Sequence, residues 1–229
     1  MAEEIPFVPA VLAYAVPMAL IYDAELRPGK MDLISDWLPT TVWFPTQEPV
    51  TAHKLCSFRF DDPDGQVGIE TSIVAAGGVT VQVPLTYRGA PLAGADRFLI
   101  TEMDHSVLGR RWVYDALGDP VYAQALEAAL FSRQGQAAQY TERNGVREFL
   151  PETMRISSSG MPDGAELVDA PPSEPQDWTV SVLEHSGWEF PVVRLLDLDG
   201  RTAPDPALSA TWEGQDIPVV LAWGVPLEN

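Results

Sequence analysis

The chain has 229 residues, a length that fits one domain or two unequal ones. Its 14 Lys and Arg residues against 33 Asp and Glu residues give a formal net charge of −19. This charge repels phosphate backbones and anionic lipid surfaces, so we expect neither nucleic acid nor a membrane as a partner. Hydrophobic residues at 46% and charged residues at 21% are typical of a globular protein and exclude a disordered chain or a coiled coil.

The N-terminal region contains an apolar run, residues 8–22, that superficially resembles a signal peptide. However, Glu3 and Glu4 precede it in place of basic residues, and two prolines interrupt it, so it does not fit a signal peptide or a membrane-spanning helix. We expect residues 1–17 to be a loosely attached N-terminal extension. The single cysteine, Cys56, cannot form an internal disulfide, which predicts a reducing compartment, the cytoplasm.

The first half of the chain predicts one short helix followed by a β-meander. Apolar residues recur at three-to-four spacing over 31–38, which predicts an amphipathic helix. Residues 54–60 alternate with a period of two and predict a strand. The runs 67–75 and 79–87 are separated by two glycines, which predicts a hairpin and thus three meandering antiparallel strands. Pro84 cannot donate a backbone hydrogen bond, so its strand should be an edge or a bulge at that point.

The middle of the chain predicts two more extended segments and a second helix. Residues 98–103 and 107–114 are rich in β-branched and aromatic residues, as strands are. Asp119 is well placed as an N-cap, with Pro120 at the first helical position of an apolar stripe. Gly135 is the expected end of this helix.

The last third of the chain predicts more strands around a linker. Residues 146–156 predict a strand that Pro151 interrupts, and residues 158–177 are rich in Pro, Gly and acids, as surface linkers are. Beyond the linker lie four short apolar runs: 178–183, 190–196, 208–212 and 218–223. We expect residues 18–157 to form an α+β domain and residues 178–229 to form a C-terminal β-hairpin unit, either separate or extending the same domain.

No catalytic motif for hydrolysis or phosphoryl transfer is found, and we expect no metal and no cofactor. The ligand-binding candidates are polar and aromatic residues in the predicted segment 107–114 and in the turn that precedes it: Asp104, His105, Arg110, Arg111, Trp112 and Tyr114. Arginine binds anions through paired hydrogen bonds, but on a strand only one of two successive arginines faces a given site. Structural ion pairs are the alternative for the arginines, and core packing is the alternative for the two aromatic residues.

Three motifs carry a resemblance to a known family. They are Trp37-Leu38-Pro39 with Trp43-Phe44, then Val83 to Leu92 (VPLTYRGAPL), then Met103 to Asp115 (MDHSVLGRRWVYD). In this order, and over about residues 18–150, they resemble the maltokinase N-terminal cap domain. The similarity is greatest to stand-alone actinobacterial versions that are loosely labelled 1,4-alpha-glucan branching-related. Few lysines beside many Ala, Gly, Pro and Arg residues are also typical of a high-GC genome.

The resemblance implies a cystatin-like fold, in which a curved antiparallel sheet is packed by a helix, with additional C-terminal β-strands in this chain. In full kinases such a cap sits on the nucleotide-binding lobe, and the catalytic lobes follow it. Because this sequence lacks catalytic motifs, the resemblance implies a non-catalytic cap module. It would bind or regulate a protein partner, such as a sugar kinase or a glucan-metabolism enzyme, in maltose, trehalose or amino-sugar metabolism.

Two alternatives remain open at this point. A curved sheet with a helix across it can enclose a pocket, which would make the chain a small-molecule-binding protein or a cryptic enzyme. A structural homodimer through exposed strand edges is the other alternative, and Pro84 partly argues against it.

Overall fold

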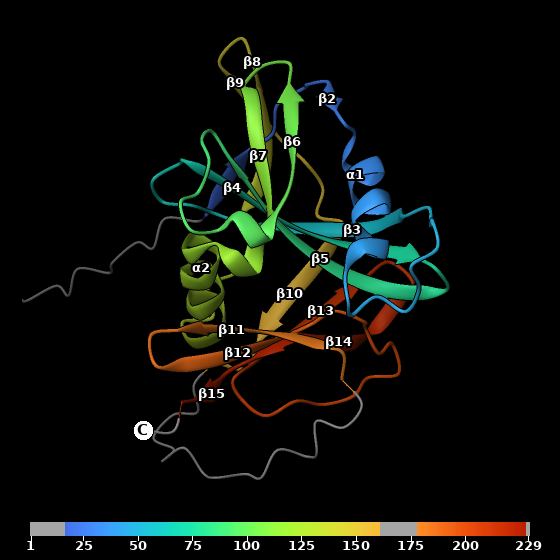
Figure 1. Ribbon diagram of the computed structural model, residues 1–229. Coiled ribbons are helices and arrows are strands. Elements are labelled where there is room, and N and C mark those ends of the chain that lie inside the picture. Colours follow the sequence, from blue (N-terminus) through green and yellow to red (C-terminus); the bar gives the residue numbers. More distant parts are fainter. Residues whose placement is uncertain (1–16, 161–177, 228–229) are drawn as a thin grey trace, which may run out of the picture.

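The computed structural model describes residues 17–160 and 178–227, which form two α-helices and three β-sheets (Figure 1). The predicted N-terminal extension, apart from residue 17, and most of the predicted linker lie outside the described residues. The helices are α1 (Lys30–Trp37) and α2 (Pro120–Phe131), with short 3-10 helices η1 (Leu38–Thr40), η2 (Asp96–Phe98) and η3 (Ala116–Gly118).

The first sheet is antiparallel and has the strand order β2-β6-β7-β5-β4-β3. Its strands are β2 (Leu26–Arg27), β3 (His53–Phe60), β4 (Val67–Ala76), β5 (Val79–Arg88), β6 (Leu99–His105) and β7 (Gly109–Asp115). The predicted meander is confirmed as β3-β4-β5. Gly77 and Gly78 form the β4–β5 turn with φ of 58° and 82°, a backbone conformation that disfavours other residues. β7 pairs with β5 only from Leu85 onward, so Pro84 faces a neighbouring strand on the β4 side alone.

The two faces of this sheet are both apolar. One face packs against α1, through residues that include Leu33, Ile34, Val74, Val81, Val83 and Met103. The other face contributes aromatic and β-branched side chains to a larger core with α2 and the C-terminal strands, including Phe58, Phe60, Ile69, Ile73, Leu126 and Val192. Antiparallel pairing explains this separation, because residues directly opposite each other share a face and successive residues alternate.

The second sheet contains the C-terminal strands and has the order β10-β13-β14-β12-β11, with β15 paired to β12. Its strands are β10 (Met154–Ser158), β11 (Val180–His185), β12 (Trp188–Val193), β13 (Ala207–Trp212), β14 (Gln215–Trp223) and β15 (Val225–Pro226). The four apolar runs predicted near the C-terminus are therefore confirmed as strands. β10 precedes the predicted linker in sequence, yet it pairs with β13 on the far side of that linker.

A third, small sheet consists of β1 (Met18–Leu20), β8 (Ala138–Arg143) and β9 (Val146–Phe149). β1 runs parallel to β8, and β8 forms a hairpin with β9. The prediction of one interrupted strand over 146–156 is wrong, because β9 and β10 are separate strands in different sheets. Pro151 lies in the segment between them, and β8 was not predicted.

Helix α2 lies between the first and second sheets (Figure 1) and shares the larger core with both. The predicted N-cap is confirmed, since the Asp119 side chain accepts a hydrogen bond from the Val121 amide at 3.0 Å. The same carboxylate accepts two hydrogen bonds from Arg88 of β5, at 2.6 and 2.7 Å. Asp119 therefore fixes the start of α2 and fastens it to the first sheet. The helix ends at Phe131, earlier than Gly135.

Buried polar side chains also connect the two sheets. The Gln82 amide of β5 donates to the carbonyl oxygens of Val193 and Leu221, at 3.0 and 3.1 Å. The Arg194 side chain, 1% exposed, donates to the Asp115 carboxylate at 2.6 Å, and its guanidinium lies 5.0 Å from the centre of the Trp43 ring. Because these polar groups lose their hydrogen bonds to water on burial, each needs a hydrogen-bond partner in the protein, and these partners lie across the interface between the two sheets.

We predict that Arg194→Ala lowers the free energy of unfolding by about 3–5 kcal/mol, because it leaves Asp115 buried without its cation. Arg201→Ala is the matched control, since Arg201 also pairs with an aspartate and lies over a tryptophan ring, but at 39% side-chain exposure. It should cost less than about 1 kcal/mol. Urea denaturation of both variants measures the difference, and equal losses would contradict the buried link.

Candidate functional site

A cleft of about 410 Å³ opens on the α1 side of the first sheet, beside the turn between β3 and β4. The strands of the sheet form one wall, and the segment 18–22 with Tyr140 of β8 forms another. Lys30, the first residue of α1, also lines the cleft, whereas α2 does not. The cleft is thus bounded by the sheet, the N-terminal strand segment and the very start of one helix.

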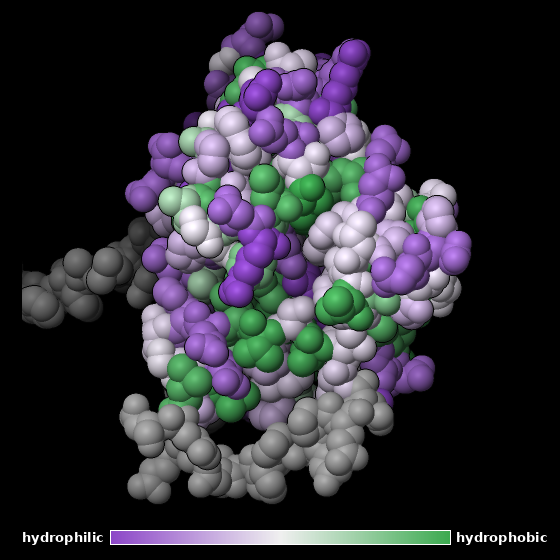
Figure 2. Space-filling view, viewed as in Figure 1, coloured by the Kyte–Doolittle hydropathy of each residue, from purple (hydrophilic) through white to green (hydrophobic). Residues whose placement is uncertain are grey.

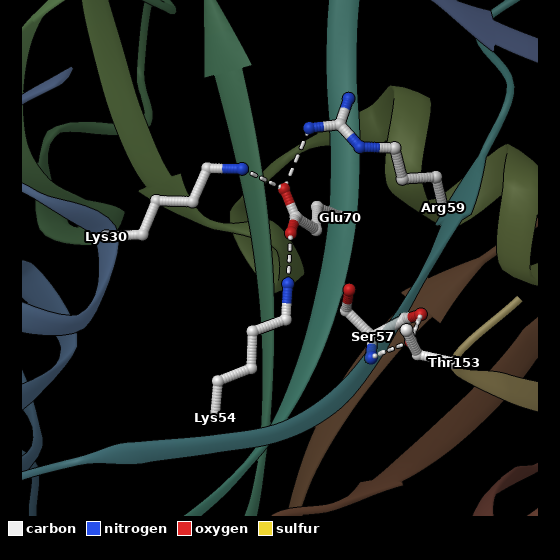
Figure 3. A network of polar contacts seen from close by, with 6 residues as sticks. All are labelled: Lys30, Lys54, Ser57, Arg59, Glu70 and Thr153. Carbon is white, nitrogen blue, oxygen red and sulfur yellow. Dashed lines mark hydrogen bonds and ion pairs between the residues drawn. The ribbon is translucent and has the colours of Figure 1, made fainter. Parts of the chain in front are cut away.

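Glu70 of β4 is the centre of a charged cluster beside this cleft. Its side chain is only 4% exposed, and Lys30, Lys54 and Arg59 converge on it from three sides (Figure 3). Arg59 Nη2 lies 2.7 Å from Oε2, which also accepts from Lys30, and Lys54 Nζ lies 3.4 Å from Oε1. The chain has only two lysines, and both contact this one carboxylate.

The three cations decide the ionisation of Glu70. Burial alone would raise the pKa of its carboxyl group, but Arg59, Lys30 and Lys54 outweigh that effect and hold the pKa well below its usual range. The pKa of Lys30 is also lowered, chiefly by burial and further by Arg59, while Glu70 opposes the shift. With all four groups ionised, three cations against one carboxylate leave a net charge of +2 in a chain of net charge −19.

Two of the predicted site residues, His105 and Arg111, line this cleft. His105 Nδ1 accepts from the amides of Val107 and Leu108 at 3.2 and 3.1 Å, so this nitrogen is unprotonated and the turn after β6 is fixed. Burial, followed by Arg111 and Lys30, lowers the pKa of His105. Arg111 Nη2 donates to the Leu108 carbonyl at 2.7 Å, while its buried Nε finds no hydrogen-bond partner among the described residues.

The other four predicted residues lie elsewhere. Arg110 and Asp104 are exposed, and Arg110 pairs with Glu102 at 3.1 Å. Successive residues of a strand face opposite sides of the sheet, as expected, so Arg111 lines the cleft and Arg110 does not. Trp112 is half-buried, and Tyr114 is 1% exposed with its hydroxyl accepting from the Leu92 amide at 2.8 Å. Tyr114 thus fits the core-packing interpretation, and the sequence candidates do not form one site.

Sequence reasoning missed the charged cluster beside the cleft. Glu70 is the only charged residue of β4, and a lone carboxylate in a buried strand signals a paired charge. The presence of only two lysines was a second signal of a specific ion pair. However, no local sequence pattern indicates that residues 30, 54 and 59 contact residue 70. Their meeting depends on the position of α1 against the sheet.

Within residues 17–160 and 178–227, no group of three or more His, Cys, Asp or Glu side chains is arranged to hold a metal ion. No helix in this part of the chain is long and apolar enough to cross a membrane.

Residues 37–119 match the maltokinase N-terminal cap domain. The matched range contains all three sequence motifs and is shorter than the range of about 18–150 over which we expected the resemblance. It includes strands β3 to β7, five of the six strands of the first sheet. No curated protein matches the chain.

We predict that Glu70→Gln lowers the free energy of unfolding by about 3–5 kcal/mol at neutral pH, because it leaves three cations without their counterion. Glu102→Gln is the control, since its exposed pair with Arg110 should contribute less than about 1 kcal/mol. Urea denaturation measures both values.

The effect should also depend on pH. The folded pKa of Glu70 is lower than the unfolded one, so its stabilisation is complete above about pH 4.3 and is lost as the pH falls toward the folded pKa. The stability gap between the native chain and Glu70→Gln should therefore narrow on acidification below that pH. A gap that stays constant or widens would contradict the charged pairing of Glu70.

Proposed function

We propose that this chain is a non-catalytic cap module of the cytoplasm that binds or regulates an enzyme of α-glucan or sugar metabolism, such as a sugar kinase. The match of residues 37–119 to the maltokinase N-terminal cap domain is the observation that supports this proposal. The cystatin-like arrangement belongs to the proposal as well, with α2 against β3 and β4 as its helix.

Packing restricts where a partner can bind on residues 37–119, which we call the cap region. Its sheet is covered by α1 on one face and by α2 with the second sheet on the other. The accessible parts are therefore the turns and edges, and the β6–β7 turn exposes an apolar residue, Val107, to 55%. Figure 2 shows hydrophilic side chains gathered at the end of the molecule where β6 to β9 lie. The residue after Val107, Leu108, is 39% exposed, so this turn presents two adjacent apolar side chains to a partner.

Charge gives a second property of the proposed interaction. With a net charge of −19, the chain is attracted to a partner surface that is rich in Lys and Arg. Such attraction accelerates association and is screened by salt. The association rate should therefore fall as the salt concentration rises.

We predict that Val107→Asp weakens binding to the partner by about tenfold or more, whereas Val182→Asp leaves it within about twofold. Val182 lies on β11 outside the matched region, is 52% exposed and undergoes the same change in charge, so it is a matched control. The experiment first isolates partners with the tagged chain from the source organism. Each recovered sugar kinase or glucan-metabolism enzyme is then purified, and its affinity and turnover are measured with and without the chain.

A direct interaction that changes the turnover of such an enzyme, and that Val107→Asp weakens, would support the proposal. Failure of every purified sugar kinase and glucan-metabolism enzyme to bind would contradict it. Binding without any change in turnover would contradict the regulatory part.

Small-molecule binding is a second candidate function, favoured by the cleft beside Glu70. The cleft volume lies within the range of about 300–1,000 Å³ that is typical of ligand sites.

The homodimer through strand edges, expected as an alternative from the sequence, stays a prediction. Light scattering of the purified chain tests it.

A further inference from the structure

We infer that the cleft beside Glu70 binds a small phosphomonoester, with the phosphate near Lys30, Arg59 and Arg111 and an apolar or aromatic body against the tyrosines of the wall. This inference rests on the second candidate function, small-molecule binding, and is independent of binding to a protein partner.

The charge balance of the cleft favours an anion. Lys30, Arg59 and Arg111 line it, and they come from α1, β3 and β7. The buried Glu70 neutralises only part of the cluster, which keeps a net charge of +2 when Lys54 is counted. Close packing of cations is unfavourable unless anions balance them, so an anionic ligand would offset the remaining positive charge.

Unused hydrogen-bond donors point to the same ligand. A guanidinium has five N–H donors. For Arg59 the structure shows one hydrogen bond, from Nη2 to Glu70, within the described residues. The buried Nε of Arg111 donates none within the same residues, although a buried donor without an acceptor is destabilising. Phosphate oxygens suit paired donation from arginine.

The two acidic residues at the cleft lower its positive charge without reversing it: Lys30, Lys54, Arg59 and Arg111 against Glu70, Asp61 and Asp62 leave a net charge of +1. Asp61 and Asp62 lie at the β3–β4 turn, and both line the cleft. The Asp62 carboxylate accepts hydrogen bonds from three backbone amides, those of Asp64, Gln66 and Val67, at 2.7–3.1 Å. Asp61 interacts with the backbone of Met18. These contacts engage the two acids in holding the turn and the N-terminal segment.

The rest of the cleft suits an uncharged body. Aromatic and apolar side chains contribute to its lining: Leu20, Tyr22, Phe60, Tyr87, Met103 and Tyr140. Lys30 Nζ lies 5.3 Å from the centre of the Tyr87 ring, so the cationic end and the aromatic wall are adjacent. One ligand can therefore contact both.

Calorimetric titration of the purified chain with phenyl phosphate, inorganic phosphate and phenol tests the inference. Phenyl phosphate should bind most tightly, because it alone combines the dianion with an aromatic body. Arg111→Gln should weaken its binding by about tenfold or more, and Arg110→Gln should leave it within about twofold. Arg110 is the neighbouring arginine, exposed and paired with Glu102 away from the cleft, so it controls for the loss of one positive charge.

Loss of binding in Arg111→Gln alone supports the anion site. No binding of phenyl phosphate, equal weakening by both variants, or equal affinity for phenol overturns it. In the last case the cleft still binds small molecules, so failure of the anion site is distinguished from failure of the second candidate function. If Arg111→Gln does not fold, Arg111→Lys replaces it. This variant keeps the charge but removes the Nε–H, so weaker binding supports the site and unchanged binding overturns it.

Discussion

The first sheet is apolar on both faces, and each face must be covered to keep water from it. Helix α1 packs on one face, while α2 and the second sheet pack on the other. The second sheet contains strands from both sides of residues 161–177, because β10 pairs with β13. Asp119, Gln82 and Arg194 then form buried hydrogen bonds between these layers. The fold therefore follows from one requirement, the enclosure of a two-sided sheet.

The candidate site arises where one of these covers ends. Helix α1 has 8 residues and is thus about 12 Å long. Strands β4 and β5 have 10 residues each and extend about 33 Å, so the helix cannot cover their whole length. Near the start of α1 the sheet carries Arg59 and Glu70 in place of purely apolar side chains, and Lys30 of α1 contacts Glu70. A charged cleft at the end of the helix is the physical result.

The cap region and the rest of the chain have separate structural roles. Residues 37–119 provide five strands of the first sheet, while most of α1, all of α2 and the second sheet lie outside the match. The parts outside the match bury the faces of the matched sheet. A partner that recognises the cap must therefore reach its turns and edges, whereas a small ligand can enter the cleft. Val107 itself does not line the cleft, so substitutions at Val107 and at Arg111 test the two proposed activities separately.

The sequence by itself determined the local features: the helix over 31–38, the hairpin at two glycines, the Asp119 N-cap and four C-terminal strands. These depend on side-chain period, turn geometry and capping within a few residues, which is information that a short segment contains. It also provided the cap resemblance, and it placed His105 and Arg111 among the site candidates. Only the tertiary structure decided that residues 146–156 divide between two sheets and that three cations meet at Glu70. Those outcomes depend on which distant strands and helices pack together, and no local pattern encodes the free energy of such long-range contacts.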